Sequence, residues 1–484
     1  MHDWFDHILY ATRAQPEASA ILMEDRVITY GMLGDSIASC ARRITALGLA
    51  ADGLVAVCID NPARHMSVSL ALFRIGLRAI SIEPGNKGAT GLHFSALLGD
   101  AAAAASFTPA DGLVEVRDDW FAPDATVPRL QLPSPFAGSE RICRHSLTSG
   151  STGVPKILDH SVGALGRSIA STVGFSNCGL VLCMPGLSSV FGFRIALGAL
   201  ASRKTLCFAE SPYQAIRMID LFGIDLLYAA TEQLVALVRV ARKTGAHLRS
   251  LRTTVVAGGI PTRALLEGAA AYLCKDVRCR YGTSELGVLA EATATKVLEN
   301  PGLIGFVLPG FEMAAFRENG APCAPGEMGI VKARVKPGPD HGEDFWTDHG
   351  DVGWITKDGE VFVVGRTSDI NSADLASGTA RDVAPVYEVE HLVRLEWDSA
   401  DAAAVIVESA DGNDGCEIWV ATVDCKDASA DQLQQILRRR GIEGIVRLVA
   451  VPAIPRGAAG KIQRAQLQLM MNESSGQILG QRAP

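Results

Sequence analysis

The stretch Thr148-Ser149-Gly150-Ser151-Thr152-Gly153-Val154-Pro155-Lys156 decides how this 484-residue chain is interpreted. Four hydroxyl side chains and two glycines lie within six residues, and a proline and a lysine follow. Glycines let backbone N–H groups converge, hydroxyls add donors and the lysine adds charge, so the pattern predicts a phosphate cradle. It differs from a Walker loop, in which the lysine directly follows the last glycine. A polar surface turn is the alternative, but such a turn needs neither this many hydroxyls nor the Pro-Lys pair.

The composition restricts which partners this cradle serves. Hydrophobic residues make up 48% and charged residues 20% of the chain, which is typical of a globular protein and excludes disordered and fibrous classes. With 45 Lys plus Arg against 53 Asp plus Glu, the net charge is −8. Such a chain has no polybasic surface for nucleic acid or an anionic membrane, so a phosphate-bearing partner must be bound locally.

Two features predict a reduced, cytoplasmic protein. The eleven cysteines are scattered without a CxxC pair, and the amino terminus lacks the basic and apolar regions of a secretory signal. The candidate membrane span at 179–202 is interrupted by Pro185 and Arg194. A buried strand, loop and helix explain that stretch better than a bilayer helix.

Outward from the loop, the chain alternates strand and helix patterns. Apolar runs at 54–59 and 79–82 flank a helical pattern at 66–77, which predicts a βαβ unit with two parallel strands. The alternation recurs as a helix, strand, helix and strand at 215–221, 225–229, 233–242 and 253–257. Beyond residue 310, hairpin patterns at 326–331 and 359–365 indicate antiparallel structure. We expect an α/β fold with a large domain over 1–366 and a smaller α+β domain over 367–484.

Two segments that follow strands carry polar groups beside glycines. In 277–287, Tyr281 can stack on a base and Glu285 can hold Mg²⁺, although a solvated glutamate at a strand end is an equal alternative. In 257–261, Gly258 and Gly259 can admit a flat ligand against bare backbone, but a plain strand-to-helix turn explains them at least as well.

Two later segments complete the set. Asp351, expected in a tight turn, can accept both hydroxyls of a ribose, and Arg366 at a strand end can add donors; an ordinary β-turn is the alternative. Lys461 lies in a glycine-rich loop before a helix, where a lysine judged alone is more often solvated than catalytic.

In this order, the segments resemble the core motifs of the adenylate-forming superfamily, which includes acyl-CoA synthetases, adenylation domains of nonribosomal peptide synthetases and firefly luciferase. The matches are the loop ending in Pro155-Lys156, the Gly258-Gly259 turn, the Tyr-Gly-x-Ser-Glu run at 281–285, the Gly-Asp and Gly-Arg pairs, and the final Gly-Lys. The resemblance implies a large multi-layer domain with a β-barrel-like subdomain, and a mobile carboxy-terminal domain that carries the catalytic lysine and closes over the site.

The resemblance also implies residue roles. The catalytic residues would be Lys461, Glu285, Ser284 and Arg366, with Glu285 holding Mg²⁺. The nucleotide-binding residues would be Thr148, Ser149, Gly150, Ser151, Thr152, Gly153, Lys156, Gly258, Gly259, Ile260, Arg280, Tyr281, Gly282, Thr283, Asp351 and Arg366. Rotation of the small domain would occur about Ser368 and Asp369.

The implied activity is ATP-dependent conversion of a small-molecule carboxylic acid to an acyl adenylate, with pyrophosphate release and transfer to a thiol. The thiol belongs to CoA or to the phosphopantetheine of a carrier protein. The longer path from Ile370 to Pro385 departs from the family pattern in the loop that shapes the thiol tunnel, so adenylation is better supported than transfer to CoA. A stand-alone adenylation domain for an amino acid-like substrate and a nucleotide-binding module without ligase activity remain alternatives.

The predicted acid pocket lies around 186–194. This stretch holds no acidic residue for an amino group, which argues against an amino-acid substrate, and Ser188 and Ser189 replace the histidine or aromatic residue common in acyl and aryl ligases. Arg194 can anchor a second carboxylate of the substrate; the favoured alternative is an arginine that extends to the edge of its helix.

Overall fold

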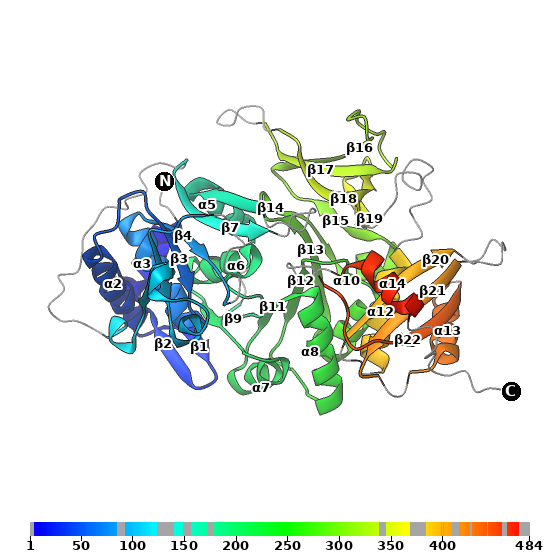
Figure 1. The fold of residues 1–484 in the computed structure, drawn as a ribbon, viewed down its shortest axis with the longest axis horizontal. Helices are drawn as coiled ribbons and strands as arrows, with labels where there is room; N and C mark the ends of the chain where they lie inside the picture. The colour runs from blue at the N-terminus through cyan, green and yellow to red at the C-terminus, as the bar shows by residue number, and fades with distance from the viewer. Residues whose placement is uncertain are drawn as a thin grey trace.

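The computed structural model describes residues 4–84, 92–122, 140–148, 156–172, 178–337, 345–367, 384–397, 399, 401–408, 416–425, 428–442, 444–456 and 462–473. Its described strands form a 13-stranded, a 6-stranded and a 3-stranded sheet. The two larger sheets and their helices form the amino-terminal part, and the smallest sheet lies at the carboxy-terminal end of the molecule (Figure 1). The predicted α/β fold class, with a large part followed by a smaller one, is confirmed.

The 6-stranded sheet has the order β6-β5-β3-β4-β7-β8. Strands β3 (Leu54–Cys58) and β4 (Arg78–Ser81) are parallel and are joined by α3 (Pro62–Ile75), which confirms the predicted βαβ unit. The helix begins before the predicted residue because the Asn61 side chain caps it and Pro62 fits the first helical turn. The remaining elements of this region are β5 (Ala96–Gly99), α4 (Ala101–Ala104), β6 (Leu113–Glu115), and short 3-10 helices at Pro109–Asp111 and Asp118–Trp120.

Strands β7 (Ile142–Thr148) and β8 (Lys156–Ser161) form the antiparallel edge of this sheet. Thr148 pairs with Lys156 across the two strands. The ends of the predicted phosphate loop are therefore the facing ends of a hairpin.

The 13-stranded sheet has the order β16-β17-β18-β19-β15-β14-β13-β12-β11-β9-β10-β1-β2. Strands β1, β10, β9, β11, β12 and β13 pair in parallel, and the other pairs are antiparallel. The parallel half is β1 (Ser19–Met23), β9 (Leu180–Cys183), β10 (Thr205–Cys207), β11 (Leu226–Ala230), β12 (Thr253–Ala257) and β13 (Asp276–Thr283). The antiparallel strands are β2 (Arg26–Thr29), β14 (Gly287–Thr293), β15 (Leu303–Val307), β16 (Phe311–Phe316), β17 (Gly329–Val335), β18 (Thr347–Ile355) and β19 (Glu360–Arg366).

The helices alternate with these strands as predicted. They are α1 (Trp4–Ala14), α2 (Tyr30–Ala46), α5 (Val162–Thr172), α6 (Val190–Ala201), α7 (Pro212–Phe222), α8 (Thr231–Thr244), α9 (Arg263–Tyr272) and α10 (Ala294–Glu299). One apolar core joins α1, α2, α3, α5 and α6 to strands of both large sheets. Within it, the Phe73 and Phe193 rings meet edge to face with centroids 6.2 Å apart.

The stretch considered as a membrane span folds as predicted into a strand, β9, a loop and a helix, α6. Within the described ranges, no helix combines the length and apolar character needed to cross a bilayer.

The carboxy-terminal part consists of α12 (Ala384–Glu396), β20 (Asp401–Glu408), β21 (Cys416–Val423), α13 (Ala430–Arg439), β22 (Ile445–Ala450) and α14 (Arg464–Glu473). Helix α12 packs against α8 and α9, and its apolar residues belong to the same core cluster as theirs. The Glu388 carboxylate accepts hydrogen bonds from the Ala264 N–H at 3.1 and 3.2 Å and pairs with Arg440 at 2.9 Å. The predicted boundary after Arg366 falls beyond the end of β19 and remains a prediction.

Candidate active site

Asp351 is the buried centre of a polar cluster that also contains the half-buried Tyr281 and the exposed Arg366. It is 5% exposed and pairs in register with Arg366 on the neighbouring strand β19. Its Oδ1 atom lies 3.0 Å from Arg366 Nε, and its Oδ2 atom accepts a hydrogen bond from the Tyr281 hydroxyl at 2.5 Å. The structure thus brings Tyr281 together with two side chains of strands much later in the sequence.

The prediction that a tight turn presents Asp351 was wrong. The residue lies within β18, directly after Gly350, whose φ is +72°, and Gly353 on its other side has a packing cause. Gly353 lies so close to β19 that a Cβ atom there would be 1.9 Å from the Phe362 carbonyl oxygen. Glycine in a strand often marks such a close backbone approach, which the sequence does not distinguish from a turn.

The protonation states in this cluster suit hydroxyl binding. Burial and the negative charge of Asp351 raise the pKa of Tyr281 well above its ordinary value, so the phenol remains protonated and donates to Asp351. Each ionised carboxylate oxygen has a second acceptor position. Asp351 can therefore accept further hydrogen bonds from a ligand while Tyr281 and Arg366 hold it in place.

Glu285 lies in the turn between β13 and β14, where its side chain is 34% exposed. Its Oε2 atom is 3.6 Å from Nδ1 of His349, whose side chain is 4% exposed. Burial raises the pKa of Glu285, but the neighbouring His349, a backbone N–H and Thr283 outweigh burial and lower it. Glu285 is therefore ionised at neutral pH.

The donor set around Glu285 fits Mg²⁺ better than a metal held by protein alone. The described part of the chain contains no group of three or more His, Cys, Asp or Glu side chains that could hold a metal ion. Mg²⁺ usually binds through one or two carboxylates and the phosphates of a substrate. One ionised, partly exposed carboxylate meets that requirement.

The turn after β12 holds Gly258, Gly259 and Ile260. Gly258 has a φ of +83°, and a Cβ atom at Gly259 would lie 2.6 Å from Oγ1 of Thr231. The positive φ of Gly258 and the close Thr231 side chain at Gly259 thus account for both glycines, as the strand-to-helix interpretation expected. Contact with a nucleotide base remains a prediction.

The rest of the run from Arg280 to Ser284 is held by local contacts. Arg280, which is 8% exposed, pairs with Glu291 at 2.5 Å and donates to the Tyr228 hydroxyl at 3.2 Å. A Cβ atom at Gly282 would lie 2.3 Å from the carbonyl oxygen of the residue that begins β14. The hydroxyl of Thr283 accepts a hydrogen bond from the backbone in the following turn. These contacts fix the strand that carries Tyr281.

Several predicted residues lie outside the described part of the chain. They are Ser149, Gly150, Ser151, Thr152, Gly153, Ser368, Asp369 and Lys461. Thr148 ends β7, and the exposed Lys156 begins β8, so the structure places both ends of the loop.

The predicted pocket residues on the loop before α6 make defined contacts. Ser188 donates to Glu83 Oε1 at 2.6 Å, and Ser189 caps the helix by accepting the Gly192 N–H at 3.0 Å. The favoured interpretation, in which Arg194 extends to the edge of its helix, was wrong. Arg194 is 5% exposed and donates to the carbonyl oxygens of Thr283 at 3.3 Å and Ser284 at 2.8 Å.

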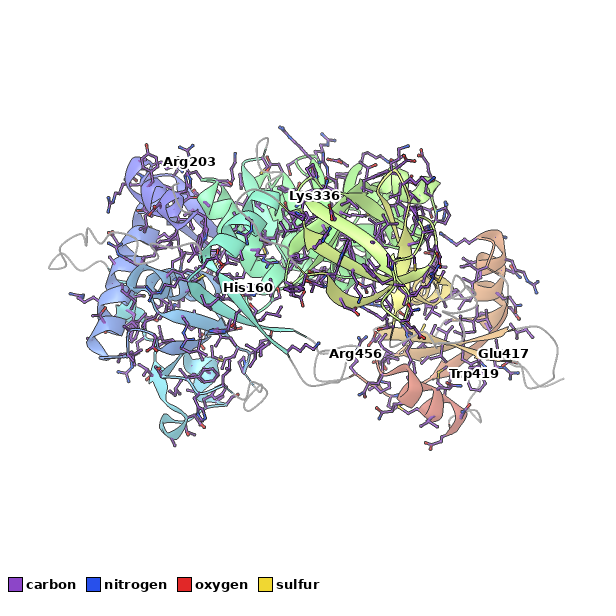
Figure 2. All side chains as sticks on the ribbon, turned by 90° about the horizontal axis from the view of Figure 1, so that it is seen from above. His160, Arg203, Lys336, Glu417, Trp419 and Arg456 are labelled. Carbon is purple, nitrogen blue, oxygen red and sulfur yellow. The ribbon has the colours of Figure 1, made fainter. Side chains whose placement is uncertain are left out.

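Sequence analysis missed a second buried arginine, Arg144. It lies on β7, is 1% exposed, and its guanidinium carbon is 3.5 Å from the centroid of the Phe193 ring. Its strand, Ile142–Thr148, is mostly polar in sequence, so no local pattern marks Arg144 as buried. His160 on β8, which is 2% exposed, lies within the amino-terminal part, well away from Arg456 and Trp419 of the carboxy-terminal part (Figure 2).

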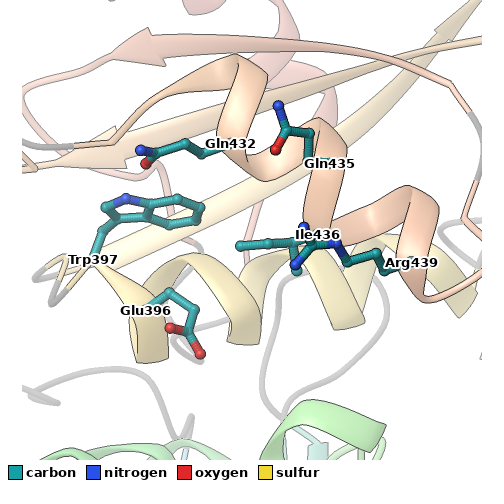
Figure 3. Close-up of a pocket in the computed structure, with 6 residues that line it drawn as sticks. All are labelled: Glu396, Trp397, Gln432, Gln435, Ile436 and Arg439. Atoms are coloured by element: carbon teal, nitrogen blue, oxygen red, sulfur yellow. The ribbon is translucent and has the colours of Figure 1, made fainter.

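A cavity of about 250 Å³ lies in the carboxy-terminal part, between α13 and the end of α12 (Figure 3). It is lined by Glu396, Trp397, Gln432, Gln435, Ile436 and Arg439. None of these residues belongs to the motifs above, so this cavity is separate from the candidate site.

Comparisons with known proteins agree with the motif order. Residues 10–335 match the family model described as AMP-binding enzyme. The 4-chlorobenzoate–CoA ligase of Arthrobacter is 25% identical over 97% of this chain and 95% of its own length. The 2-succinylbenzoate–CoA ligase of Geobacillus kaustophilus is 25% identical over 97% of this chain and 98% of its own. The solved structure of o-succinylbenzoate CoA synthetase from Bacillus subtilis, in complex with an acyl-adenylate intermediate, covers 97% of this chain and 98% of its own at 19% identity, with a TM-score of 0.74.

Proposed function

Because this chain belongs to the AMP-binding enzyme family, we propose that it uses ATP to convert a carboxylic acid to an acyl adenylate, releases pyrophosphate, and transfers the acyl group to a thiol. The observation that carries this proposal is the cluster of Tyr281, Asp351 and Arg366, with Glu285 beside it. Separate sequence motifs contribute these side chains. The negative charge of Glu285 also contributes to the raised pKa of Tyr281.

In this proposal, Asp351 accepts the ribose hydroxyls while Arg366 and Tyr281 hold its carboxylate. Tyr281 also lines the adenine position, together with Gly258, Gly259 and Ile260. The residues Thr148 to Gly153 and Lys156 cradle the β- and γ-phosphates. The pairing of Thr148 with Lys156 at the facing ends of β7 and β8 supports this role, since both ends of the loop are held next to each other.

The reaction brings two anions together. A carboxylate oxygen of the acid attacks the α-phosphorus, so charge must be neutralised on the entering acid and on the leaving pyrophosphate. In this proposal, Ser284 lies near the α-phosphate, and Lys461 bridges the α-phosphate and the carboxylate of the acid. A magnesium ion bound by Glu285 would supply further positive charge to the phosphates. A carboxylate nucleophile needs no general base, so no catalytic triad is required.

The acceptor thiol is that of CoA. The names of the relatives support this choice, since both are CoA ligases, and solved structures of the Bacillus subtilis CoA synthetase include one with ATP and a magnesium ion. A carrier-protein phosphopantetheine is the second candidate acceptor. We assign adenylation to residues 1–366 and Lys461 to a mobile domain over 367–484 that rotates about Ser368 and Asp369.

A pyrophosphate-release assay over a panel of carboxylic acids, with CoA present or withheld, tests the proposal. We expect release that depends on an acid, and thioester only when CoA is added. The Lys461→Ala variant should lose more than about a hundredfold in adenylate formation, as expected when one charged stabiliser is removed, while ATP binding measured by calorimetry persists. The exposed Lys243 on α8 provides the matched control, Lys243→Ala.

The outcomes separate the candidate functions. Normal turnover in Lys461→Ala would refute the role of that lysine. ATP binding without pyrophosphate release from any acid would instead favour a nucleotide-binding module. Release driven by amino acids alone would favour the amino acid-like alternative.

A further inference from the structure

Two arginines are buried on facing elements beside the candidate site. Arg144 on β7 is 1% exposed, and Arg194 on α6 is 5% exposed. Phe193, whose ring lies against Arg144, is the neighbour of Arg194 in the chain. Burial lowers the pKa of both groups, Arg144 to about 9 and Arg194 to about 10, and the positive charge of Arg194 contributes to the shift at Arg144. Both remain charged at neutral pH.

A chain of neutral groups holds Arg144 in place. Its Nη2 atom donates to Ser81 Oγ at 2.9 Å and to the Leu187 carbonyl at 3.2 Å. His65 Nε2 lies 2.7 Å from Ser81 Oγ, and His65 Nδ1 lies 3.1 Å from the Ile59 carbonyl. Since burial lowers the pKa of His65 to about 4, its ring is neutral, donates from Nδ1 and accepts from the serine hydroxyl. Arg144 is therefore oriented without a counter-ion among its hydrogen-bond partners.

Donors in this region remain unused. The Nε and Nη1 atoms of Arg144 and the Nε atom of Arg194 are buried and have no hydrogen-bond partner among the residues that the structure describes. The Nε2 atom of His160, a residue 2% exposed, is also without one. A buried charge that lacks a counter-ion is destabilising by several kcal/mol, and a bound carboxylate would offset that cost for this pair of arginines.

These donors lie where a substrate acid would bind. The Leu187 carbonyl that Arg144 contacts directly precedes Ser188, and Arg194 contacts the carbonyl oxygens of Thr283 and Ser284. The negative charge that acts on Arg194 is that of Glu285, which is assigned to the metal. The arginines thus supply excess positive charge beside the predicted acid pocket.

We propose that Arg144 and Arg194 receive a second carboxylate of the acid, so that the substrate is a dicarboxylic acid of which one carboxylate is activated. Arg144 offers Nε and Nη1 and Arg194 offers Nε, and hydrogen bonds from such charged donors to a carboxylate are among the strongest in proteins. This inference rests on the proposed ligase function and specifies its substrate class.

The test compares matched acids that differ by one carboxylate. The panel pairs 2-succinylbenzoate with 4-oxo-4-phenylbutanoate, isophthalate with benzoate, and adipate with hexanoate, and kcat/KM is measured by pyrophosphate release. We expect wild-type enzyme to prefer the dicarboxylic member of the pair it uses by at least tenfold. Arg144→Met and Arg194→Met should each lower kcat/KM for that acid by roughly thirtyfold or more, the range found when one partner of a buried charge pair is removed. The monocarboxylic partner should lose far less.

The ratio of the two kcat/KM values distinguishes recognition from general damage. Because Arg194→Met also removes contacts to the backbone near Ser284, its rate with every acid will fall, but only a recognition role changes the ratio. Arg74→Met is the matched control, since Arg74 is a buried arginine on α3, 8% exposed, and its ratio should match wild type. The wild-type ratio is informative even if a variant fails to fold.

Each outcome has a defined meaning. Equal or better use of the monocarboxylic acid by wild type, or an unchanged ratio in both methionine variants, overturns the inference and leaves the ligase function intact. If none of the acids in a wider panel causes pyrophosphate release, the proposed function is overturned, and the inference with it.

Discussion

Replacement of His65 by asparagine should change how stability depends on pH. His65 lies on α3 and is 4% exposed, and burial lowers its pKa from 6.5 to about 4. Between these two pH values, the unfolded state binds a proton at His65 and the folded state does not. The contribution of neutral His65 to the free energy of unfolding is therefore complete above pH 6.5 and is lost as pH falls from 6.5 toward 4. For these two pKa values, the loss between pH 7 and pH 5 is about 1.8 kcal/mol. Asparagine can keep the hydrogen bond to the Ile59 carbonyl and does not titrate.

Hydrogen–deuterium exchange of peptides from β3, α3 and β4, corrected for the intrinsic pH dependence of exchange, gives the local opening free energy. Between pH 7 and pH 5, the opening free energy of the wild type should fall by about 1.8 kcal/mol more than that of His65→Asn. His247→Asn, which replaces an exposed histidine, should follow wild type at both pH values. A difference between wild type and His65→Asn that changes by less than about 0.5 kcal/mol would refute the reasoning and would mean that His65 is accessible to protons in the folded state.

Three further changes test the arrangement around the site. Tyr281→Phe removes a hydrogen bond to the ionised Asp351, a type of bond that contributes about 1.5–3 kcal/mol, so the KM for ATP should rise by roughly tenfold or more; steady-state kinetics with an unchanged KM would contradict the role of this cluster. Gly353→Ala places a Cβ atom 1.9 Å from the Phe362 carbonyl oxygen and should destabilise the protein by about 3 kcal/mol in thermal unfolding, whereas Gly179→Ala, whose nearest neighbour would be at 3.9 Å, should melt close to wild type. Arg440→Met removes the ion-pair partner of Glu388 at 2.9 Å and of Glu267 at 3.0 Å, so amide exchange in α12 should become faster by an amount that corresponds to about 2 kcal/mol. Equal exchange in Arg440→Met and in the exposed-site control Arg438→Met would show that these ion pairs do not hold α12 against α9.

The sequence predicts those parts of the fold that local patterns determine. The βαβ unit at β3 and β4 follows from continuous apolar runs, which are typical of strands buried on both faces. The strand predicted at 253–257 coincides with β12 for the same reason. The order of short polar motifs predicted the family, which the family model over 10–335 confirms.

The sequence does not reveal contacts between distant segments. Asp351 was expected in a turn because glycines flank it, yet Gly353 serves the close approach of β19. Arg194 was expected at a helix edge because the preference of arginine for water is a general rule, but carbonyl oxygens almost ninety residues later hold it inside. Arg144 was overlooked because its partners Ser81 and Leu187 come from other elements.

The buried arginines also change the meaning of the net charge of −8. An acidic chain that activates an acid with ATP must create positive potential locally, and Arg144 and Arg194 do so in the interior, where water screens it least. In the proposed function, Lys461 would supply a further positive charge from the carboxy-terminal part of the sequence. The two sources should therefore have separable effects: loss of Lys461 should slow the reaction of every acid by a similar factor, whereas loss of either arginine should change which acids react. A variant without Lys461 that retained the wild-type order of preference among acids would place recognition in the amino-terminal part and the catalytic lysine in the carboxy-terminal part.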